Sequence, residues 1–278
     1  MSARLGQRAL AVLPDGERQS AHDAAVFNLR EKRDQAGRDE PDFERLREHA
    51  RAAKAHALDH LDLLLERFEE SASRAGAVVH WAEDAPALNR IVHQLLESRG
   101  ARRVVKSKSM LTEECGLNPY LESRGVEVVD TDLGERIVQL GNEPPSHIIM
   151  PAIHRSREDI GALFHRELDV PVGETDPVRL TEAARRHLRS RFLGADAAIT
   201  GANFAIAESG TLVVVTNEGN ADLGMSLPGL HVACLGIEKV IPGLADLAVL
   251  LRLLARSATG QPISVYTSLV TGPRPGAE

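Results

Sequence analysis

The sequence is poor in aromatic residues, cysteine and long apolar runs, and each shortage excludes a class of protein. Aromatic residues make up 3% of the chain, which leaves little to stack against nucleobases. The formal net charge of −7 also argues against binding to nucleic acid or to an anionic membrane surface. The two cysteines, Cys115 and Cys234, stand far apart in apolar or helical surroundings. We therefore expect reduced thiols rather than a disulfide framework.

Apolar runs are also short. None approaches the roughly 20 residues that a membrane-spanning helix needs. The opening residues, MSARLGQRALAVLPDG, are too short and too polar for a signal peptide. These features predict a cytoplasmic protein with no membrane span and no nucleic-acid partner.

The remaining composition is typical of a globular protein, and changes in the sequence pattern divide the chain into three parts. The 278 residues are 43% hydrophobic and 26% charged, which suits one large domain with a helical appendage. We expect an N-terminal helical segment over residues 1–76 and an α/β domain over residues 77–270. Residues 271–278 are rich in proline and glycine and predict a linker-like end.

The N-terminal part carries apolar residues at helical spacing. A first helix is predicted over residues 21–36, and one long amphipathic helix over residues 43–73. His56 and His60 stand four residues apart on the second helix, as metal ligands on a helix do. No acidic third ligand accompanies them, so we interpret them as part of a solvated face and predict no metal site.

From residue 77 onward, short β-rich runs alternate with helical segments. Strands are predicted at 77–81, 102–106, 126–129, 147–150, 231–235 and 263–269. Helices are predicted at 84–99, 112–125, 176–192 and 244–254, with a further helix opened by Ser156 and Asp159 in a capping box. This alternation predicts an α/β fold with a mostly parallel sheet flanked by helices.

The stretch from Ile199 to Asn220, ITGANFAIAESGTLVVVTNEGN, stands out. Two β-rich runs, 204–207 and 211–216, flank Glu208-Ser209-Gly210, which predicts a β-hairpin. Polar residues gathered where buried strands end are typical of ligand sites in α/β proteins. An ordinary hairpin followed by a polar turn is the alternative.

Three further polar clusters follow strands or precede helices. Lys106-Ser107-Lys108-Ser109 offers two cations at a helix start, which suits a carboxylate or phosphate, although a solvated turn is an alternative. His154 follows a predicted strand and could exchange a proton or simply hold a loop by hydrogen bonding. The last cluster, Arg256-Ser257-Ala258-Thr259-Gly260-Gln261, follows a predicted helix and precedes a predicted strand. The candidate substrate-binding residues are Lys106, Lys108, Ser109, His154, Asn203, Thr216, Asn217, Glu218, Asn220, Arg256, Thr259 and Gln261, with Glu208 as the catalytic candidate.

Several motifs are missing. The lysine-serine turn lacks the glycines of a phosphate-binding loop, so nucleotide binding has weak support. No G-x-S-x-G elbow, H-E-x-x-H helix or dense Cys/His spacing occurs, which leaves serine-hydrolase and zinc-enzyme interpretations without a basis.

Four segments carry a family resemblance: KSKSMLTEECGLN, VVDTDLGERIVQLGNEPPSHIIMPAIHRSREDI, ITGANFAIAESGTLVVVTNEGN and LLRLLARSATGQPISVYTSLVTGPR. Together they resemble the LUD domain of bacterial lactate utilization iron–sulfur proteins, from about Ala21 to Arg274. The resemblance implies a fold similar to the sugar-phosphate isomerase and CoA-transferase-like superfamily. It also implies a part in oxidising L-lactate to pyruvate, with the other subunits of a lactate oxidation complex as partners and a small carboxylate as substrate.

The sequence departs from this family in one respect. The family's iron–sulfur proteins continue into a ferredoxin-like region whose cysteine runs bind 4Fe–4S clusters. With two cysteines, this chain cannot supply four thiolates to even one such cluster. We therefore predict no cofactor in this chain, 4Fe–4S clusters in the full-length family protein, and either a truncated or a naturally short form.

Three functions remain open at this point. In the first, the domain binds lactate or docks subunits: Lys106 and Lys108 hold the carboxylate, Glu208 acts as a base or hydrogen-bond acceptor, and Asn203, Asn217 and Asn220 orient the ligand. In the second, by fold analogy alone, Glu208 is the nucleophile of a CoA-transferase or ligase-like enzyme. In the third, the domain is a non-catalytic scaffold.

Overall fold

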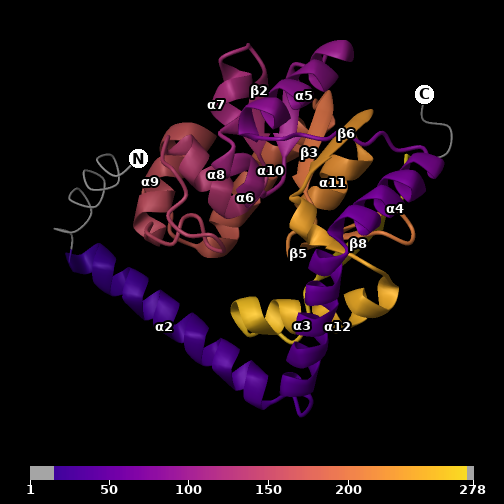
Figure 1. Ribbon diagram of the computed structural model, residues 1–278. Helices are drawn as coiled ribbons and strands as arrows, with labels where there is room; N and C mark the ends of the chain where they lie inside the picture. The colour runs from indigo at the N-terminus through magenta and orange to yellow at the C-terminus, as the bar shows by residue number, and fades with distance from the viewer. Residues whose placement is uncertain (1–15, 274–278) are drawn as a thin grey trace, which may run out of the picture.

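The computed structural model describes residues 16–273 (Figure 1). Residues 1–15 of the predicted helical segment and residues 274–278 of the predicted linker lie outside this range. In chain order the elements are α2 Gly16–Arg38, α3 Phe43–Asp59, α4 Leu61–Arg74, α5 Ala85–Ser98, β1 Arg103–Lys106, α6 Met110–Glu114, α7 Leu117–Glu122, β2 Glu127–Asp130, α8 Leu133–Leu140, α9 Arg157–Leu168, α10 Pro177–Leu193, β3 Ala197–Gly201, β4 Phe204–Ile206, β5 Thr211–Thr216, α11 Asn220–Ser226, β6 Leu230–Cys234, η1 Ile237–Lys239, β7 Val240–Ile241, α12 Leu244–Thr259 and β8 Tyr266–Val270.

The described strands form two four-stranded sheets. The first, in the order β2-β1-β3-β6, is parallel throughout, and the second, β7-β4-β5-β8, is mixed. Helices flank both sheets, so the α/β class and the parallel sheet predicted from the sequence are confirmed. The antiparallel hairpin expected around Glu208 is the β4–β5 pair, in which Ile206 is opposite Thr211.

The parallel sheet is covered on both faces because its strands are apolar on both sides. Alternate residues of β1 and β2 point to opposite faces. Val104 and Val128 pack against α5 and α7, whereas Val105 and Val129 pack against α10 through Phe192. This double cover explains why both strands read as continuous apolar runs.

The mixed sheet lies between the N-terminal helices and α12. Phe68 of α4 packs with Ala205 on one face, and Leu247 of α12 packs with Ile206 and Val213 on the other. The β4–β5 turn needs glycine, since Gly210 has φ +67° and a Cβ there would lie 2.2 Å from the Ala72 nitrogen. Figure 1 shows α2 extending away from the two sheets beside α12 and α3.

The outer edge of β2 is closed by a side chain. The Gln139 amide of α8 donates to the Val128 carbonyl (2.8 Å) and accepts from the Asp130 N–H (3.0 Å). Since β2 ends the order of the parallel sheet, Gln139 takes hydrogen-bonding groups that a further strand would use.

Two predicted strands are wrong. Residues 77–81 form no strand; Val78 and Trp81 are exposed, and the Trp81 indole bonds Glu69 instead. Residues 147–150 form a loop in which the N–H groups of Ile149 and Met150 both donate to His147 Nδ1. Apolar periodicity alone cannot distinguish a strand from a loop when no neighbouring strand is present.

Two predicted helices are each divided. The helix expected over 43–73 breaks at His60, whose φ and ψ of −124° and 32° separate α3 from α4. The helix expected over 112–125 breaks at Gly116 in the left-handed region, between α6 and α7. In both places the apolar pattern continues across the break, so the sequence does not reveal it.

Candidate functional site

Buried polar side chains collect at the carboxyl ends of the parallel strands. Lys106 ends β1, Asp130 ends β2 and Thr200 lies near the end of β3, and none is more than 5% exposed. Parallel α/β sheets bind ligands at this edge, so we take this carboxyl edge as the candidate site.

Lys106 is the centre of the buried group. Its Nζ lies 2.8 Å from Asp130 Oδ1 and 3.0 Å from Glu113 Oε1, and the side chain is fully buried. Burial alone would lower the pKa of Lys106, but the acidic side chains around it, Asp130 foremost, raise it above its ordinary value. Lys106 therefore stays a cation matched to carboxylates and is unsuited to act as a nucleophilic amine.

Glu135 of α8 is buried in the same group, at 3% exposure. Its Oε2 has no hydrogen-bond partner among the described residues. Burial raises the pKa of Glu135 to about 8; Lys106 opposes this rise, and the carboxylates of Asp130 and Asp132 add to it. Glu135 is therefore mainly an uncharged acid at neutral pH.

A hydrogen-bonded chain links this group to the loop after β5. The Thr131 hydroxyl donates to the Lys106 carbonyl (3.0 Å), and the Asn220 amide donates to Thr131 Oγ1 (3.3 Å). Asn220 accepts in turn from the Thr216 hydroxyl (3.3 Å), and Thr216 Oγ1 accepts from the Glu218 N–H. The structure thus brings Lys106, Thr216, Glu218 and Asn220 together at the carboxyl edge.

Glu218 lies at the amino end of α8. Its Oε2 accepts from the Leu133 N–H (3.2 Å), where the helix dipole favours a carboxylate. Burial of the carboxyl and the charge of Asp132 raise the pKa of Glu218 to about 7, against the opposing effects of the Leu133 N–H and Lys108. Because the residue also keeps an exposed surface, its proton can exchange with solvent or a ligand.

Lys108 and Ser109 occupy the loop after β1. Lys108 Nζ donates to the Ile149 carbonyl (2.7 Å) and lies within electrostatic reach of Glu218. Ser109 is buried and caps α6 by accepting from the Thr112 N–H. Of the two predicted lysines, Lys108 is the one that is only partly buried, so it is the cation that a ligand can reach.

Several predicted residues border this group. Asn203 holds the hairpin, since its Oδ1 accepts from the Val215 N–H (2.8 Å). Asn217 bonds Gln261 (3.4 Å) and accepts from the Val265 N–H. Their positions give them a role in shaping the loop after β5, and ligand contact by either stays a prediction.

Glu208 lies at the opposite end of β5 from this group. Its Oε1 accepts from the Leu244 N–H (3.0 Å) at the first residue of α12, and its carbonyl accepts from Ser71. The six residues of β5 separate it from Glu218. The structure therefore gives Glu208 a helix-capping contact, and a catalytic role for it stays a prediction.

Arg256 and Thr259 lie in the last turn of α12, and no contact links either of them to Lys106 or Glu218 among the described residues. Arg256 forms an ion pair with Glu40 (3.1 Å), which is 8% exposed on its side chain and also binds Arg252. The Thr259 hydroxyl donates to the Ala255 carbonyl within the helix. In the structure, Arg256 ties α12 to the turn between α2 and α3.

His154 belongs to a separate cluster in the loop between α8 and α9. Its Nδ1 lies 2.7 Å from Ser146 Oγ and its Nε2 lies 2.9 Å from Glu143 Oε2. Arg155 binds the same carboxylate. The structure therefore does not place His154 among the residues that surround Lys106.

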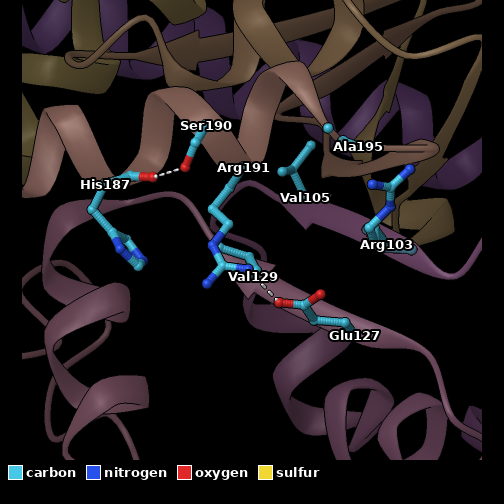
Figure 2. Close-up of a pocket in the computed structure, with 10 residues that line it drawn as sticks. Arg103, Val105, Glu127, Val129, His187, Ser190, Arg191 and Ala195 are labelled. Atoms are coloured by element: carbon cyan, nitrogen blue, oxygen red, sulfur yellow. Dashed lines mark hydrogen bonds and ion pairs between the residues drawn. The ribbon is translucent and has the colours of Figure 1, made fainter. Parts of the chain in front are cut away.

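A pocket of about 210 Å³ lies between α10 and the strands β1 and β2 (Figure 2). Its floor is apolar, including Val105 and Val129, and Figure 2 shows Arg191 paired with Glu127 across it. Arg103 at its rim is paired with Asp196. These arginines are already neutralised, and none of the predicted site residues lines the pocket.

Sequence reasoning missed the acids that surround Lys106. Asp130 closes the apolar run Val128-Val129, and a charged residue ending a buried strand is a signal that could have identified it. Glu113 and Glu135 lie on helices, where nothing in their spacing marks them. Within residues 16–273, no group of three or more His, Cys, Asp or Glu side chains could hold a metal ion, and no helix in that range has the length and hydropathy to cross a bilayer.

Comparison with known proteins gives a consistent result. The profile of a family described as "LUD domain" matches residues 65–278. The chain is 44% identical over 233 residues to lactate utilization protein B of Geobacillus thermodenitrificans, which covers 84% of this chain and 49% of the relative. It is 41% identical over 263 residues to lactate utilization protein B of Shouchella clausii, covering 94% and 55%.

A third relative carries a different description. The chain is 42% identical over 232 residues to an "Uncharacterized electron transport protein" of Escherichia coli K12, covering 84% of this chain and 49% of that protein. The chain thus spans about half the length of the curated relatives it matches. No solved structure matches it significantly, so the predicted similarity to the sugar-phosphate isomerase and CoA-transferase-like superfamily stays a prediction.

Proposed function

Because the chain belongs to the LUD domain family, we propose that it serves in the use of L-lactate. In this proposal it binds a small 2-hydroxy or 2-oxo carboxylate at the carboxyl edge of the parallel sheet. The names of its relatives support a part in lactate utilization. The geometry of Lys108 and Glu218 supports the carboxyl edge as the binding site.

The observation that carries this proposal is that Lys108 lies within electrostatic reach of Glu218, whose carboxylate binds the amino end of α8. Lys108 is a partly buried cation suited to a carboxylate. The pKa of Glu218, about 7, is matched to proton exchange at neutral pH. Lys108 would hold the ligand carboxylate, and Glu218 would accept the proton of the 2-hydroxyl group.

The buried group around Lys106 has a different part in this proposal. Its cation already faces Asp130 and Glu113, so a ligand carboxylate placed there would meet like charges. In this proposal Lys106 holds the ends of the strands and their loops in place, and Lys108 binds the ligand carboxylate. This assigns the two predicted lysines different roles.

Oxidation of a 2-hydroxy acid also releases two electrons, and their acceptor lies outside this chain in the proposal. The two cysteines cannot hold a 4Fe–4S cluster. One relative is described as an electron transport protein, and the relatives are about twice as long. We therefore place the acceptor in another part of a multi-subunit complex, where the longer family proteins would contribute 4Fe–4S clusters.

The competing acyl-transfer function requires Glu208 to face a ligand. The contact of Glu208 with the Leu244 N–H supplies a structural reason for a carboxylate at that position, which favours the lactate proposal. A scaffold function predicts no small-molecule binding, so a binding measurement separates all three.

Calorimetric titration of the chain with L-lactate, pyruvate and CoA tests this proposal. We expect binding of L-lactate or pyruvate, and a loss of at least tenfold in affinity for Lys108→Ala, since a charged hydrogen bond contributes about 1.5–3 kcal/mol. Lys32→Ala is the matched control, an exposed lysine on α2, and should leave affinity unchanged. Binding of CoA without lactate or pyruvate would overturn the proposal, as would equal affinity of Lys108→Ala.

A further inference from the structure

Three side chains in the loop between α8 and α9 are aligned as nucleophile, base and orienting acid. Ser146 Oγ lies 2.7 Å from His154 Nδ1, and His154 Nε2 lies 2.9 Å from Glu143 Oε2. A hydroxyl bonded to an imidazole that an acid orients is the pattern of an activated serine, here with His154 Nδ1 rather than Nε2 facing the hydroxyl. The sequence has no G-x-S-x-G motif around Ser146, since one loop supplies all three residues within twelve positions.

Glu143 determines which nitrogen of His154 carries the proton. Arg155 holds the Glu143 carboxylate through both oxygens, at 2.6 and 3.0 Å. Burial would raise the pKa of Glu143, but the hydrogen bonds from His154 and Arg155 outweigh it and lower that pKa. An ionised carboxylate can only accept, so His154 Nε2 donates to it. Neutral His154 then presents the lone pair of Nδ1 to the Ser146 hydroxyl.

The loop holds this arrangement at fixed points. The Glu143 N–H donates to the Val138 carbonyl at the end of α8, and the Ser146 N–H donates to the Pro151 carbonyl. Lys108 anchors the loop through the Ile149 carbonyl. Pro144, Pro145 and Pro151 reduce the freedom of the backbone around the serine. The three side chains are thereby preorganised.

Ser146 is also accessible, and apolar surface lies beside it. The residue is exposed, and Ile148 and Ile149, two and three positions further on, are 62% and 37% exposed. A small acyl group could rest against these side chains while its carbonyl carbon approaches Ser146 Oγ.

We propose that Ser146 is an activated nucleophile that takes the acyl group of small carboxylic esters. Ser146 Oγ forms a bond to the carbonyl carbon while its proton passes to His154 Nδ1. The bond from that carbon to the alcohol oxygen then breaks, and His154 returns the proton to the departing alcohol. Water can release the acyl group by the same route in reverse. This activity goes beyond the proposed function, and none of its reacting residues is assigned to that function.

Deacylation and turnover should be slow. The N–H groups of Ile149 and Met150, which could stabilise an oxyanion, already donate to His147 Nδ1 at 3.1 Å. Acylation needs the same stabilisation, but an ester with a good leaving group acylates Ser146 faster than water releases the acyl group, so covalent labelling is a more sensitive readout than steady hydrolysis.

The alternative is a structural lock. Ser146 Oγ also lies 3.0 Å from the Pro151 carbonyl, so its hydroxyl could serve only to close the loop. A lock predicts that Ser146 reacts no faster than any other exposed serine. Ser98 is the matched reference, an exposed residue whose hydroxyl donates to the Leu95 carbonyl.

The experiment incubates the chain with p-nitrophenyl acetate, follows nitrophenolate release and locates the acetyl group by tandem mass spectrometry. We expect a burst with acetylation at Ser146, absent in Ser146→Ala and unchanged in Ser98→Ala. His154→Gln should slow acetylation of Ser146 by about 100-fold or more, the usual contribution of a general base. Circular dichroism checks that each variant is folded.

Glu143→Gln provides a second measurement should His154→Gln fail to fold. It keeps the side-chain shape but removes the carboxylate that orients His154, so acetylation of Ser146 should slow by at least tenfold while Ser98 is unaffected. Acetylation of Ser146 no faster than that of Ser98 would overturn the proposal. Equal rates in the parent chain and the folded His154 or Glu143 variant would overturn it as well.

Discussion

Glu208 and Glu218 lie at opposite ends of strand β5 and make the same kind of bond. Each accepts a backbone N–H at the first residue of a helix, Leu244 of α12 or Leu133 of α8. Their surroundings differ: Glu208 stands exposed at a hairpin turn, whereas Glu218 faces Asp132 and Lys108 above a buried charged group. The same local contact is therefore a cap at one end and part of a candidate site at the other.

This comparison shows why a sequence motif alone could not rank the two glutamates. Both precede a small residue and both close a β-rich run. What distinguishes them is the parallel sheet, which ends beneath Glu218 and brings Lys106 and Asp130 to that place. If the comparison is sound, variants at the two ends should differ in predictable ways.

The largest effect should come from removing the buried cation beneath the Glu218 end. Lys106→Met leaves Asp130 and Glu113 without their ion-pair partner, and losing one member of a buried pair costs about 3–5 kcal/mol. Urea unfolding at pH 7 measures this loss. Lys32→Met on the exposed face of α2 is the control and should change stability by less than about 0.5 kcal/mol. A loss below 1 kcal/mol at Lys106 would show that the charged group does not support this end.

A second test uses the pH dependence of stability. The pKa of Glu135 is about 8 in the fold, against about 4.5 for an ordinary glutamate, so the folded state holds an extra proton between these values. The contribution of Glu135 to the free energy of unfolding is fully present below about pH 4.5 and is lost as pH rises through 8. Over that range the free energy of unfolding falls by up to about 1.4 kcal/mol per pH unit. Glu135→Gln should flatten the curve.

The measurement is a series of urea unfolding curves from pH 5 to pH 8, with Glu66→Gln on the exposed side of α4 as control. A parent and a Glu135→Gln curve of equal slope would contradict the assignment of a neutral Glu135.

A third test compares the two glutamates directly. Glu218→Gln should remove a pH dependence of lactate affinity, because protonation of Glu218 below about pH 7 removes a negative charge beside Lys108. In the parent chain, affinity should fall about fivefold as pH rises through 7, equivalent to about 1 kcal/mol. Glu208→Gln should leave that profile unchanged. Calorimetry at pH 6 and pH 8 measures the lactate affinity of each variant. If the affinities of Glu208→Gln and Glu218→Gln depend on pH in the same way, the two ends of β5 do not differ in function.

The smallest effect should be at the Glu208 end itself. A Cβ at Gly243 would lie 2.8 Å from Glu208 Oε2, so Gly243→Ala should displace the carboxylate from the Leu244 N–H. Losing a carboxylate at a helix N-terminus costs about 0.3–1 kcal/mol, which thermal unfolding detects. Gly229→Ala, where a Cβ would meet nothing within 4 Å, is the control. Impaired ligand binding in Gly243→Ala would instead connect Glu208 with the site.

Much of the fold could be predicted because its signals are local. The β4–β5 hairpin follows from its two β-rich runs and Gly210, and α5 and α10 begin just after Asp84 and Asp176, where aspartate precedes an early proline. The strand predicted over 147–150 is wrong because a strand forms only beside a hydrogen-bonded partner strand. A single sequence does not show whether such a partner is present. The break at His60 was missed for a similar reason, since apolar spacing continues through it.

The site was predicted in part. Lys106, Lys108, Glu218 and Asn220 follow or end strands, and parallel strands bring their carboxyl ends together. Glu135 could not be found in this way, because its burial depends on how α8 packs against β2. The Ser146–His154 contact also depends on a loop that doubles back through Pro151, which residue spacing does not reveal.

The amide of Gln139 along β2 has a consequence for assembly. Unpaired backbone groups on an outer strand invite strands from other molecules, and proteins commonly block such edges with side chains. Gln139 occupies both the Val128 carbonyl and the Asp130 N–H, so an incoming chain finds neither group free. The strand that carries Asp130 toward the candidate site is thereby shielded from intermolecular β-sheet growth, and association through the β2 edge is disfavoured.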